Sequence, residues 1–372
     1  MSLDTDAAVR ARYSDAAQSR ETELCCPVSY NPEYLEIIPD EVLERDYGCG
    51  DPSACLRDGE TVLDLGSGGG KICFIAGQVV GPSGHVIGVD MNPEMLALAR
   101  SALPKTGLEN VEFREGRIQD LTYNAAEAAR FLAERPVRNA QDALALQEHL
   151  ARHPLVADES VDVVVSNCVL NLVSGKEKTR LFREIYRVVK NGGRAVISDI
   201  VSDEPVPVAM QADSKLWSGC ISGAMREDEF LTAFTDAGFY GVRLVNRDDV
   251  PWRTVEGIEF RSVTVEAFKG KDGPCFEGLQ AVVYKGPFAA VVDDDGHRIP
   301  RGVRYAVCKK TFSLYAREPY AEHFHFVEPR APVTGDAPFD CARDSLRDPR
   351  ETKGADYDVT TDGGASCGPE CC

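Results

Sequence analysis

The chain has 372 residues, of which 27% are charged and 43% hydrophobic, and its formal net charge is −19. This composition is typical of a soluble globular protein, and the length suggests more than one domain. The acidic balance argues against nucleic acid or an anionic membrane as a partner. No apolar run approaches the roughly 18 residues of a membrane span, and the start MSLDTDAAVRARY lacks an apolar signal core, so we expect a cytoplasmic protein.

The first elements of the chain predict a helical segment followed by an α/β domain. Residues 1–47 are polar and rich in helix formers. The strands predicted after them are 61–65, 85–90, 111–115, 161–167 and 194–201, and the helices between these strands are 72–80, 92–103 and 176–190. Strands that alternate with helices indicate a doubly wound, Rossmann-like parallel sheet, which we place in residues 48–245.

Three further segments depart from this alternation. Residues 122–158 are rich in alanine and predict a helical insertion, which we interpret as a surface feature rather than a functional lid. Residues 246–330 contain short apolar runs broken by Gly-Pro and Asp-Gly turns, which predict a small β-rich C-terminal α+β domain. Residues 331–372 are dominated by Pro, Gly, Asp and Ser, which predicts a disordered tail that carries several cysteines.

A glycine turn follows the first predicted strand. In VLDLGSGGGK, Gly66, Gly68 and Gly70 are spaced G-x-G-x-G, and Asp90 ends the next strand about 20 residues later. Such a glycine turn allows a ligand to approach the backbone closely, and the carboxylate of Asp90 can hold a ribose. A dinucleotide site prefers G-x-G-x-x-G, and Asp64 would repel a pyrophosphate but suits a ligand that bears an amine. The pattern resembles the first motif of class I S-adenosylmethionine methyltransferases.

Residues at the ends of the other strands complete the predicted cofactor site. Ile118 and Gln119 follow the third strand, where such enzymes often contact adenine, although Ile118 could equally be core packing. Asn167 ends the fourth strand, beside the expected sulfonium, or serves as a turn residue. The full set of predicted cofactor-binding residues is Tyr47, Asp64, Gly66, Ser67, Gly68, Gly70, Asp90, Met91, Ile118, Gln119 and Asn167.

Thirteen cysteines are many for a cytoplasmic protein, and no CxxC pair exists among them. Such thiols are more often metal-binding or catalytic than paired in disulfides. Cys168 and Cys220 follow the fourth and fifth strands, and Cys49 lies in a loop that could fold across the crevice. Three thiols could therefore meet beside the cofactor. Soft thiolates select thiophilic acceptors, whereas zinc would require a fourth ligand, and no His is near these motifs.

Four motifs together carry a closer resemblance. DYGCGDP, DLGSGGGK, SNCVLNLV and WSGCISGA resemble the motifs of arsenite S-adenosylmethionine methyltransferases, from about Leu24 into the β-rich domain. The resemblance implies that Cys49, Cys168 and Cys220 bind trivalent arsenic and that Cys25 or Cys26 takes part in catalysis. It also implies that Tyr47 lies against the cofactor.

The resemblance further defines the expected reaction. The enzyme would methylate arsenite to methyl- and dimethylarsenicals in arsenic detoxification, as a monomer. S-adenosylmethionine would be the methyl donor, and glutathione or thioredoxin the external thiol reductant. Two positions depart from the family pattern: Asp46 stands where many relatives have a second Tyr, and Lys71-Ile72 stands where many have Arg-Asp.

Other readings stay open from the residues alone. Cys73 and Cys308 are predicted to be small core hydrophobes, Cys55 to be incidental, and Cys275 to be a spare thiol or without a role. A class I methyltransferase of an organic small molecule with structural cysteines is one alternative function. The other is a non-catalytic protein that binds metalloids through its thiols.

Overall fold

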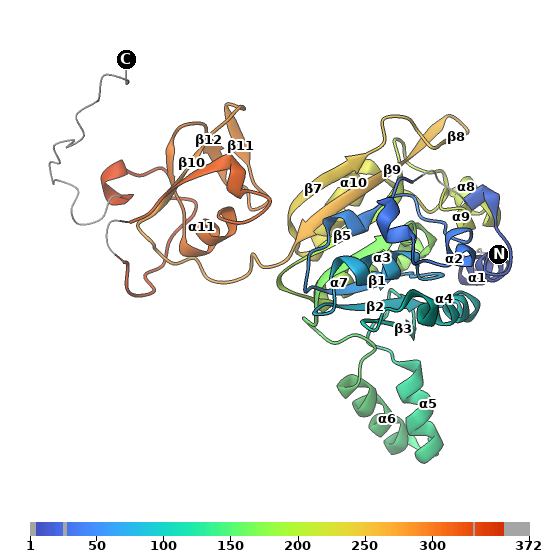
Figure 1. Cartoon of the computed structure of the whole chain (residues 1–372). Coiled ribbons are helices and arrows are strands. Elements are labelled where there is room, and N and C mark those ends of the chain that lie inside the picture. The colour runs from blue at the N-terminus through green and yellow to red at the C-terminus, as the bar shows by residue number, and fades with distance from the viewer. Residues whose placement is uncertain (1–4, 25–27, 330–331, 353–372) are drawn as a thin grey trace. The chain divides into compact units, whose positions relative to one another are not determined.

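The computed structural model describes residues 5–24, 28–329 and 332–352. The chain divides into two compact units, Met1–Gly270 and Lys271–Cys372, which are drawn in Figure 1 and described separately here. The predicted cysteines Cys25 and Cys26 lie outside the described residues. Within the described part of the chain, no helix is long and apolar enough to cross a membrane.

A parallel sheet forms the centre of the first unit. Its strands are β1 (Thr61–Leu65), β2 (His85–Asp90), β3 (Val111–Glu115), β4 (Val161–Asn167) and β5 (Val189–Ser202), and they pair in the order β3-β2-β1-β4-β5. All four pairings are parallel. The helices that connect them are α3 (Lys71–Val79), α4 (Pro93–Thr106) and α7 (Gly175–Val188). The doubly wound Rossmann-like fold is therefore confirmed, and its carboxyl strand ends form one edge.

An antiparallel edge extends this sheet beyond β5. The long strand β9 (Ile258–Phe268) pairs antiparallel with β5 on one side and with β7 (Tyr240–Arg247) on the other. The remaining elements of this region are α8 (Val208–Gln211), α9 (Ser214–Ser218), β6 (Met225–Arg226), α10 (Glu227–Ala237) and β8 (Arg253–Val255). The expected domain boundary at residue 245 is thus wrong, because β9 belongs to the first sheet and the second unit starts only at Lys271.

The core on one face of the sheet is dominated by aromatic side chains. Phe234 of α10 is fully buried and meets Phe182, Phe230 and Phe239 edge-to-face, with ring centroids 5.0, 5.4 and 6.0 Å away. Burial of each such side chain contributes about 1.5–3 kcal/mol. The strands beneath them are almost entirely buried, since the run Val163–Val165 is inaccessible to solvent. This packing fixes the strand ends that position the site.

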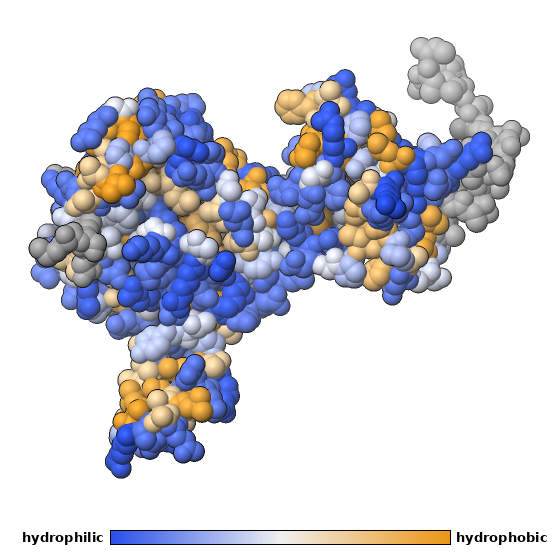
Figure 2. All heavy atoms as spheres, turned by 180° about the vertical axis from the view of Figure 1, so that it is seen from behind, coloured by the Kyte–Doolittle hydropathy of each residue, from blue (hydrophilic) through white to orange (hydrophobic). Residues whose placement is uncertain are grey.

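The first unit contains two helical segments in addition to the helices that connect its parallel strands. The N-terminal segment contains α1 (Thr5–Ala16) and α2 (Asp40–Leu43). The insertion between β3 and β4 contains α5 (Ala125–Glu134) and α6 (Ala140–Arg152), which pair as a hairpin (Figure 1). Figure 2 shows hydrophobic side chains on this hairpin, and Leu132, Val137 and Leu144 are exposed. The predicted helical insertion is therefore present, but it leaves apolar side chains in solvent.

The second unit is a small α+β domain. Strands β10 (Ala281–Tyr284), β13 (Arg304–Ala306) and β14 (Phe324–Val327) form one sheet, β11 (Ala290–Val292) pairs with β12 (Arg298–Pro300), and α11 spans Lys309–Tyr315. The predicted β-rich domain is confirmed. The disordered tail predicted from residue 331 is wrong for its first part, because Phe339 is buried and its N–H donates to the Cys275 carbonyl at 2.9 Å. Residues 353–372 lie outside the described part.

Candidate active site

A cavity lies at the carboxyl ends of β1, β2 and β4, where open α/β sheets bind their ligands. Its empty volume is about 1020 Å³, which includes space that is open to solvent. Ten of the eleven predicted cofactor-binding residues line it, namely Tyr47, Asp64, Gly66, Ser67, Gly68, Asp90, Met91, Ile118, Gln119 and Asn167.

The glycine turn shapes the floor of the cavity. Gly66 and Gly68 have φ values of 75° and 50°, in the left-handed region that favours glycine. A Cβ on Gly66 would lie 2.4 Å from Val169 Cγ1, whereas a Cβ on Gly68 would meet nothing within 4 Å. The space above Gly68 is therefore open to a ligand. Gly70 does not line the cavity, since it precedes α3 and faces Phe113, so its predicted role is limited to the turn.

Asp90 ends β2 with its carboxylate held by the backbone. Its Oδ2 accepts from the Gly68 N–H and its Oδ1 from the Asn92 N–H, both at 2.8 Å. Burial raises the pKa of Asp90 above its usual range, although these backbone donors oppose the shift. Both oxygens of this carboxylate are thus held by backbone N–H groups at the wall of the cavity.

Two further buried polar groups, the Asp64 carboxyl and the Ser67 hydroxyl, also line the cavity. Burial raises the pKa of Asp64 to about 7, against the opposing hydrogen bond from Cys73 Sγ at 3.2 Å. The Ser67 hydroxyl is buried and has no hydrogen-bond partner within the described residues. An orphaned hydroxyl and a desolvated carboxyl that both line a cavity are expected where a polar ligand supplies the missing partners.

Helix α1 covers the cavity, which sequence reasoning missed. Asp6, Val9, Arg10 and Tyr13 all line it. The helix is anchored at the N-terminal end of α4, where the Asn92 amide donates to the Arg10 carbonyl at 3.3 Å. The sequence did not reveal this role of α1 for a physical reason. A helix that covers a polar cavity does not need the apolar stripe by which a core-facing helix is recognised.

The two departures from the family pattern contact each other. Lys71 Nζ lies 2.8 Å from Asp46 Oδ2, and both side chains are largely buried. Lys71 also lies over the Tyr30 ring, 3.7 Å from its centroid. Asp46 lines the cavity beside Tyr47, whose hydroxyl donates to the Ala16 carbonyl at 3.0 Å. The substituted pair thus forms one ion pair at the cavity wall.

The three motif cysteines are brought together behind this cavity. Cys49, Cys168 and Cys220 are all buried and belong to one cluster. The sulfurs of Cys49 and Cys168 and a carboxylate oxygen of Asp199 lie within 4.8 Å of one another. The Cys220 thiol donates to the Cys168 carbonyl at 3.1 Å. The three cysteines therefore lie in one buried cluster, but the close group of ligand atoms comprises Cys49, Cys168 and Asp199 and does not include the Cys220 sulfur.

The backbone is strained at two of these cysteines. Cys168 and Cys220 have φ values of 64° and 60°, a region that non-glycine residues rarely adopt. Each such residue costs on the order of 1–3 kcal/mol, and such strain is typical of functional sites. A glycine at either position would relieve this strain.

The loop of Cys49 is anchored by Asn167. The Cys49 and Gly50 N–H groups donate to Asn167 Oδ1 at 2.8 and 3.1 Å, and Asn167 Nδ2 donates to the Gly50 carbonyl at 2.7 Å. Asn167 lines the cavity as predicted, but its amide also fixes a cysteine, which the sequence did not reveal. The loop is therefore held in place rather than free to fold across the crevice.

Two buried ionisable side chains, Asp199 and Lys178, lie beside the cysteine loops, and sequence reasoning missed them. Asp199 accepts from the Asn171 and Ile200 N–H groups, and burial raises its pKa to about 6. Burial lowers the pKa of Lys178 to about 8, although Asp199 opposes this shift. Hydrogen bonds with Cys220 and Cys49 raise the pKa of the Cys168 thiol well above its usual value. This shift favours the protonated form of the Cys168 thiol in the free protein.

The fold and the cavity define a class I S-adenosylmethionine-dependent methyltransferase. The family described as a methyltransferase domain matches residues 56–131 and 125–238. The second unit matches a domain of unknown function (DUF8838) over residues 271–357.

Relatives that match most of the chain identify the family within this class. The chain is 34% identical over 327 residues to an arsenite methyltransferase of Aquipseudomonas alcaligenes, which covers 82% of this chain and 85% of the relative. It is 31% identical over 334 residues to an arsenite methyltransferase of Mus musculus, with 86% and 79% covered. The crystal structure of an arsenic(III) S-adenosylmethionine methyltransferase from Chlamydomonas reinhardtii matches with a TM-score of 0.56 and 28% identity, covering 85% of this chain and 100% of that one. The chain belongs to the arsenite methyltransferase family.

Proposed function

We propose that the protein methylates trivalent arsenic, with S-adenosylmethionine as the methyl donor. One observation carries the proposal. Cys168 lines the cofactor cavity and at the same time belongs to the buried cluster with Cys49 and Cys220. A thiophilic acceptor bound by these sulfurs would therefore lie next to the cavity, and proximity of this kind supplies a large share of catalysis.

The cysteines hold and activate the acceptor. Arsenite exchanges three hydroxyl groups for three sulfurs, and each thiol proton leaves with a hydroxyl as water. The bound arsenic keeps its lone pair, to which the thiolates donate electron density. No general base is needed, because this lone pair carries no proton. The buried apolar surroundings, which include Ile221 and Phe260, exclude water from the acceptor.

The cavity residues fit the cofactor. S-adenosylmethionine, when bound, supplies a methyl group carried on a positively charged sulfur. Asp90 would hold its ribose hydroxyls, and Asp64 would face its amino group. The unpartnered Ser67 hydroxyl and the open backbone at Gly68 supply further contacts. Tyr47, Met91, Ile118 and Gln119 would close the remaining walls.

Turnover requires a reductant, because methylation formally oxidises arsenic. We assign this role to an external thiol such as glutathione or thioredoxin. Cys49 and Cys25 or Cys26, as a pair of thiols, are the proposed internal source of the two electrons for this reduction: they are oxidised to a disulfide, which the external thiol then reduces. Cys25 and Cys26 lie outside the described residues. Methyl- and dimethylarsenicals are the proposed products, and arsenic detoxification in the cytoplasm by a monomer is the proposed setting.

Arsenic speciation tests the proposal directly. The protein is incubated with arsenite, S-adenosylmethionine and glutathione, and the arsenic species are then separated by chromatography. Methylated arsenic should accumulate with time. Tight arsenite binding without methylated product would instead favour a sequestering protein, and methyl transfer only to a metabolite extract would favour an organic acceptor.

A further inference from the structure

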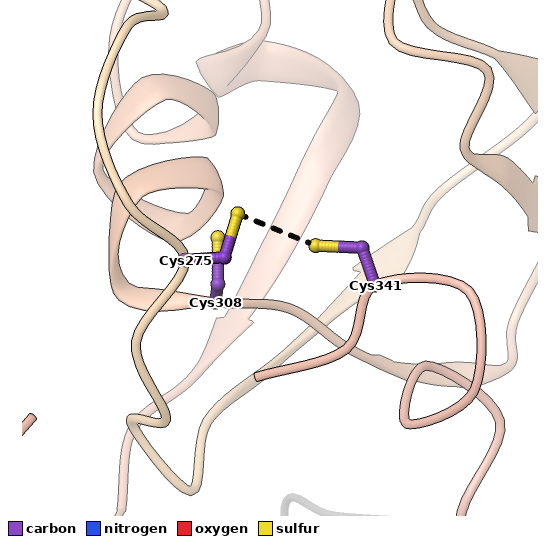
Figure 3. Close-up of side chains that lie close together, drawn as sticks. All are labelled: Cys275, Cys308 and Cys341. Atoms are coloured by element: carbon purple, nitrogen blue, oxygen red, sulfur yellow. Dashed lines mark hydrogen bonds between the residues drawn. The ribbon is translucent and has the colours of Figure 1, made fainter. Parts of the chain in front are cut away.

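A second cluster of three thiols lies in the C-terminal unit. Cys275, Cys308 and Cys341 come from three separate segments, and their side chains point toward one another (Figure 3). Their sulfurs all lie within 4.8 Å of one another, and the Cys341 and Cys275 sulfurs are 3.6 Å apart. These three cysteines have no role in the proposed methyl transfer.

The backbone around each thiol is held by hydrogen bonds. The Cys275 carbonyl accepts from the Phe339 N–H at 2.9 Å, which ties the first segment to the third. The Cys341 carbonyl accepts from the Ser345 hydroxyl at 2.7 Å. Cys308 Sγ accepts from the Thr311 N–H at 3.4 Å and lies 3.2 Å from the Thr311 hydroxyl. The three sulfurs are therefore brought together by the fold and not by chance rotamers of a mobile loop.

Access and surroundings suit a small neutral ligand. Cys308 is fully buried at the floor of the cluster, whereas Cys275 and Cys341 are only partly buried. Ala306 and Phe339 pack against the thiols and form an apolar wall. Arsenite is small and uncharged at neutral pH, so it can enter such a site without desolvation of a charge.

The number of ligands favours a three-coordinate ion. Zinc in structural sites is held by four Cys or His ligands. Within the described residues, no fourth His, Cys, Asp or Glu joins this cluster. Trivalent arsenic requires only three sulfurs, because its lone pair occupies the fourth position. The Cys275 and Cys341 sulfurs, 3.6 Å apart, are not joined in a disulfide, in which they would be about 2.05 Å apart.

We propose that Cys275, Cys308 and Cys341 form a second binding site for trivalent arsenic, in the unit that is not part of the methyltransferase sheet. Three As–O bonds of arsenite break and three As–S bonds form, each thiol proton leaves with a hydroxyl as water, and no oxidation occurs. The inference rests on the proposed function in taking arsenite as the ion that this protein handles. It goes beyond that function because the site holds arsenic without methylating it.

Arsenic binding without the cofactor tests the site. The background is the full chain with Cys49→Ser, Cys168→Ser, Cys371→Ser and Cys372→Ser, which removes the proposed active site and the adjacent C-terminal pair. The reduced protein is equilibrated with sodium arsenite, freed of excess arsenite by gel filtration, and analysed for arsenic per chain. X-ray absorption then counts the sulfur neighbours of the arsenic.

The expected result is one arsenic per chain with three sulfur neighbours. Adding Cys308→Ser should weaken arsenite binding roughly a hundredfold, since one of three linked ligands is lost. Cys341→Ser, at a less buried position, should have the same effect if Cys308→Ser disturbs folding. Cys55→Ser is the matched control, because this lone thiol lies outside the cluster, and it should leave binding unchanged.

Several outcomes would overturn the inference. These are no retained arsenic, retention that survives both Cys308→Ser and Cys341→Ser, a tightly bound zinc ion that arsenite does not displace, or a disulfide within the cluster found by thiol counting. The wild-type speciation assay separates this inference from the proposed function. If the wild type methylates arsenite but the second site does not bind arsenic, only the inference is wrong and the proposed function stands.

Discussion

At the scale of single residues, Cys168 connects the two parts of the proposed site. It follows β4 directly, lines the cavity and belongs to the buried cluster with Cys49 and Cys220. The left-handed backbone at Cys168 and Cys220 turns both thiols into the same interior. Arsenic that is bound to a sulfur at a rigid strand end is better aligned with the methyl group than arsenic that is bound to a sulfur on a mobile loop.

Replacing Asp90 should selectively weaken cofactor binding. In Asp90→Ala, loss of the ribose contacts should cost about 1.5–3 kcal/mol per charged hydrogen bond, which is roughly a tenfold to hundredfold loss of affinity. Calorimetric titration with S-adenosylmethionine measures this loss, and arsenite binding should persist. The exposed Asp249→Ala serves as the control. An unchanged affinity in Asp90→Ala would refute the ribose contact.

Asp64 should make cofactor binding dependent on pH. Its pKa of about 7 lies above the usual value, so the group favours the folded free protein below pH 3.8, and this contribution is lost as the pH rises through 7. A cationic cofactor binds the ionised form better, so affinity should increase between pH 6 and pH 8. The protein should also release protons on binding near pH 7.

Calorimetry in two buffers of different ionisation enthalpy measures this proton release. Asp64→Asn should bind more weakly and lose the pH dependence, because the amide cannot ionise. If Asp64→Asn kept the same pH profile as the wild type, another group would have to be responsible for the titration.

At the scale of elements, the parallel strands were predictable and the edge of the sheet was not. The predicted bounds of β1, β2, β3 and β4 agree with the structure, because buried parallel strands appear as short apolar runs. The helix predicted to reach Lys190 ends at Val188, since β5 begins at the next residue. The pairing of β9 with β5 joins residues that are 58 to 74 positions apart, from Ser202 with Phe260 to Arg194 with Phe268, and no local periodicity reports such a contact.

The residues of the candidate site likewise divide into those that could be located from the sequence and those that could not. Motif residues at strand ends could be located because parallel topology places all these ends at one edge. Asp199 and Lys178 could not, because each lies in an ordinary strand or helix and its role arises from burial. The Cys275, Cys308 and Cys341 cluster was equally hidden, since one member was predicted to be a core hydrophobe and another to lie in a disordered tail.

The α5–α6 hairpin should be dispensable for folding. Only Ala128 is buried in α5 and no residue is buried in α6, so little core is lost when residues 125–152 are replaced by a short Gly-Ser linker. We expect the free energy of unfolding to change by about 1 kcal/mol or less, as for other changes in surface loop length. Urea denaturation measures it. Loss of cooperative unfolding would show that the hairpin is part of the core.

At the scale of the whole molecule, the charge suits both proposed ligands. The net charge of −19 attracts a cationic cofactor and does not repel uncharged arsenite. All residues of the proposed active site lie in the first unit, which also contains β9. The second unit has its own sheets and its own thiol cluster, so its contribution to the reaction can be tested by truncation.

A chain that ends at Gly270 should fold and keep arsenite methylation. A chain that ends at Gly257 should fail to fold cooperatively, because it lacks β9, so that β5 loses its antiparallel neighbour and β7 loses the strand with which it pairs. Thermal unfolding followed by circular dichroism compares the two. Equal stability of both truncated chains would contradict the placement of β9 within the methyltransferase sheet.

The central claim is that arsenic accepts the methyl group while it is bound to Cys168. The most direct measurement is single-turnover transfer of a labelled methyl group from S-adenosylmethionine to arsenite, with wild type, Cys168→Ser and the control Cys55→Ser side by side. Wild type and Cys55→Ser should form labelled methylarsenic. Cys168→Ser should lose at least about a hundredfold in rate while still binding the cofactor, because the acceptor is no longer held beside the cavity. Methylation of arsenite by Cys168→Ser at the wild-type rate would contradict the account.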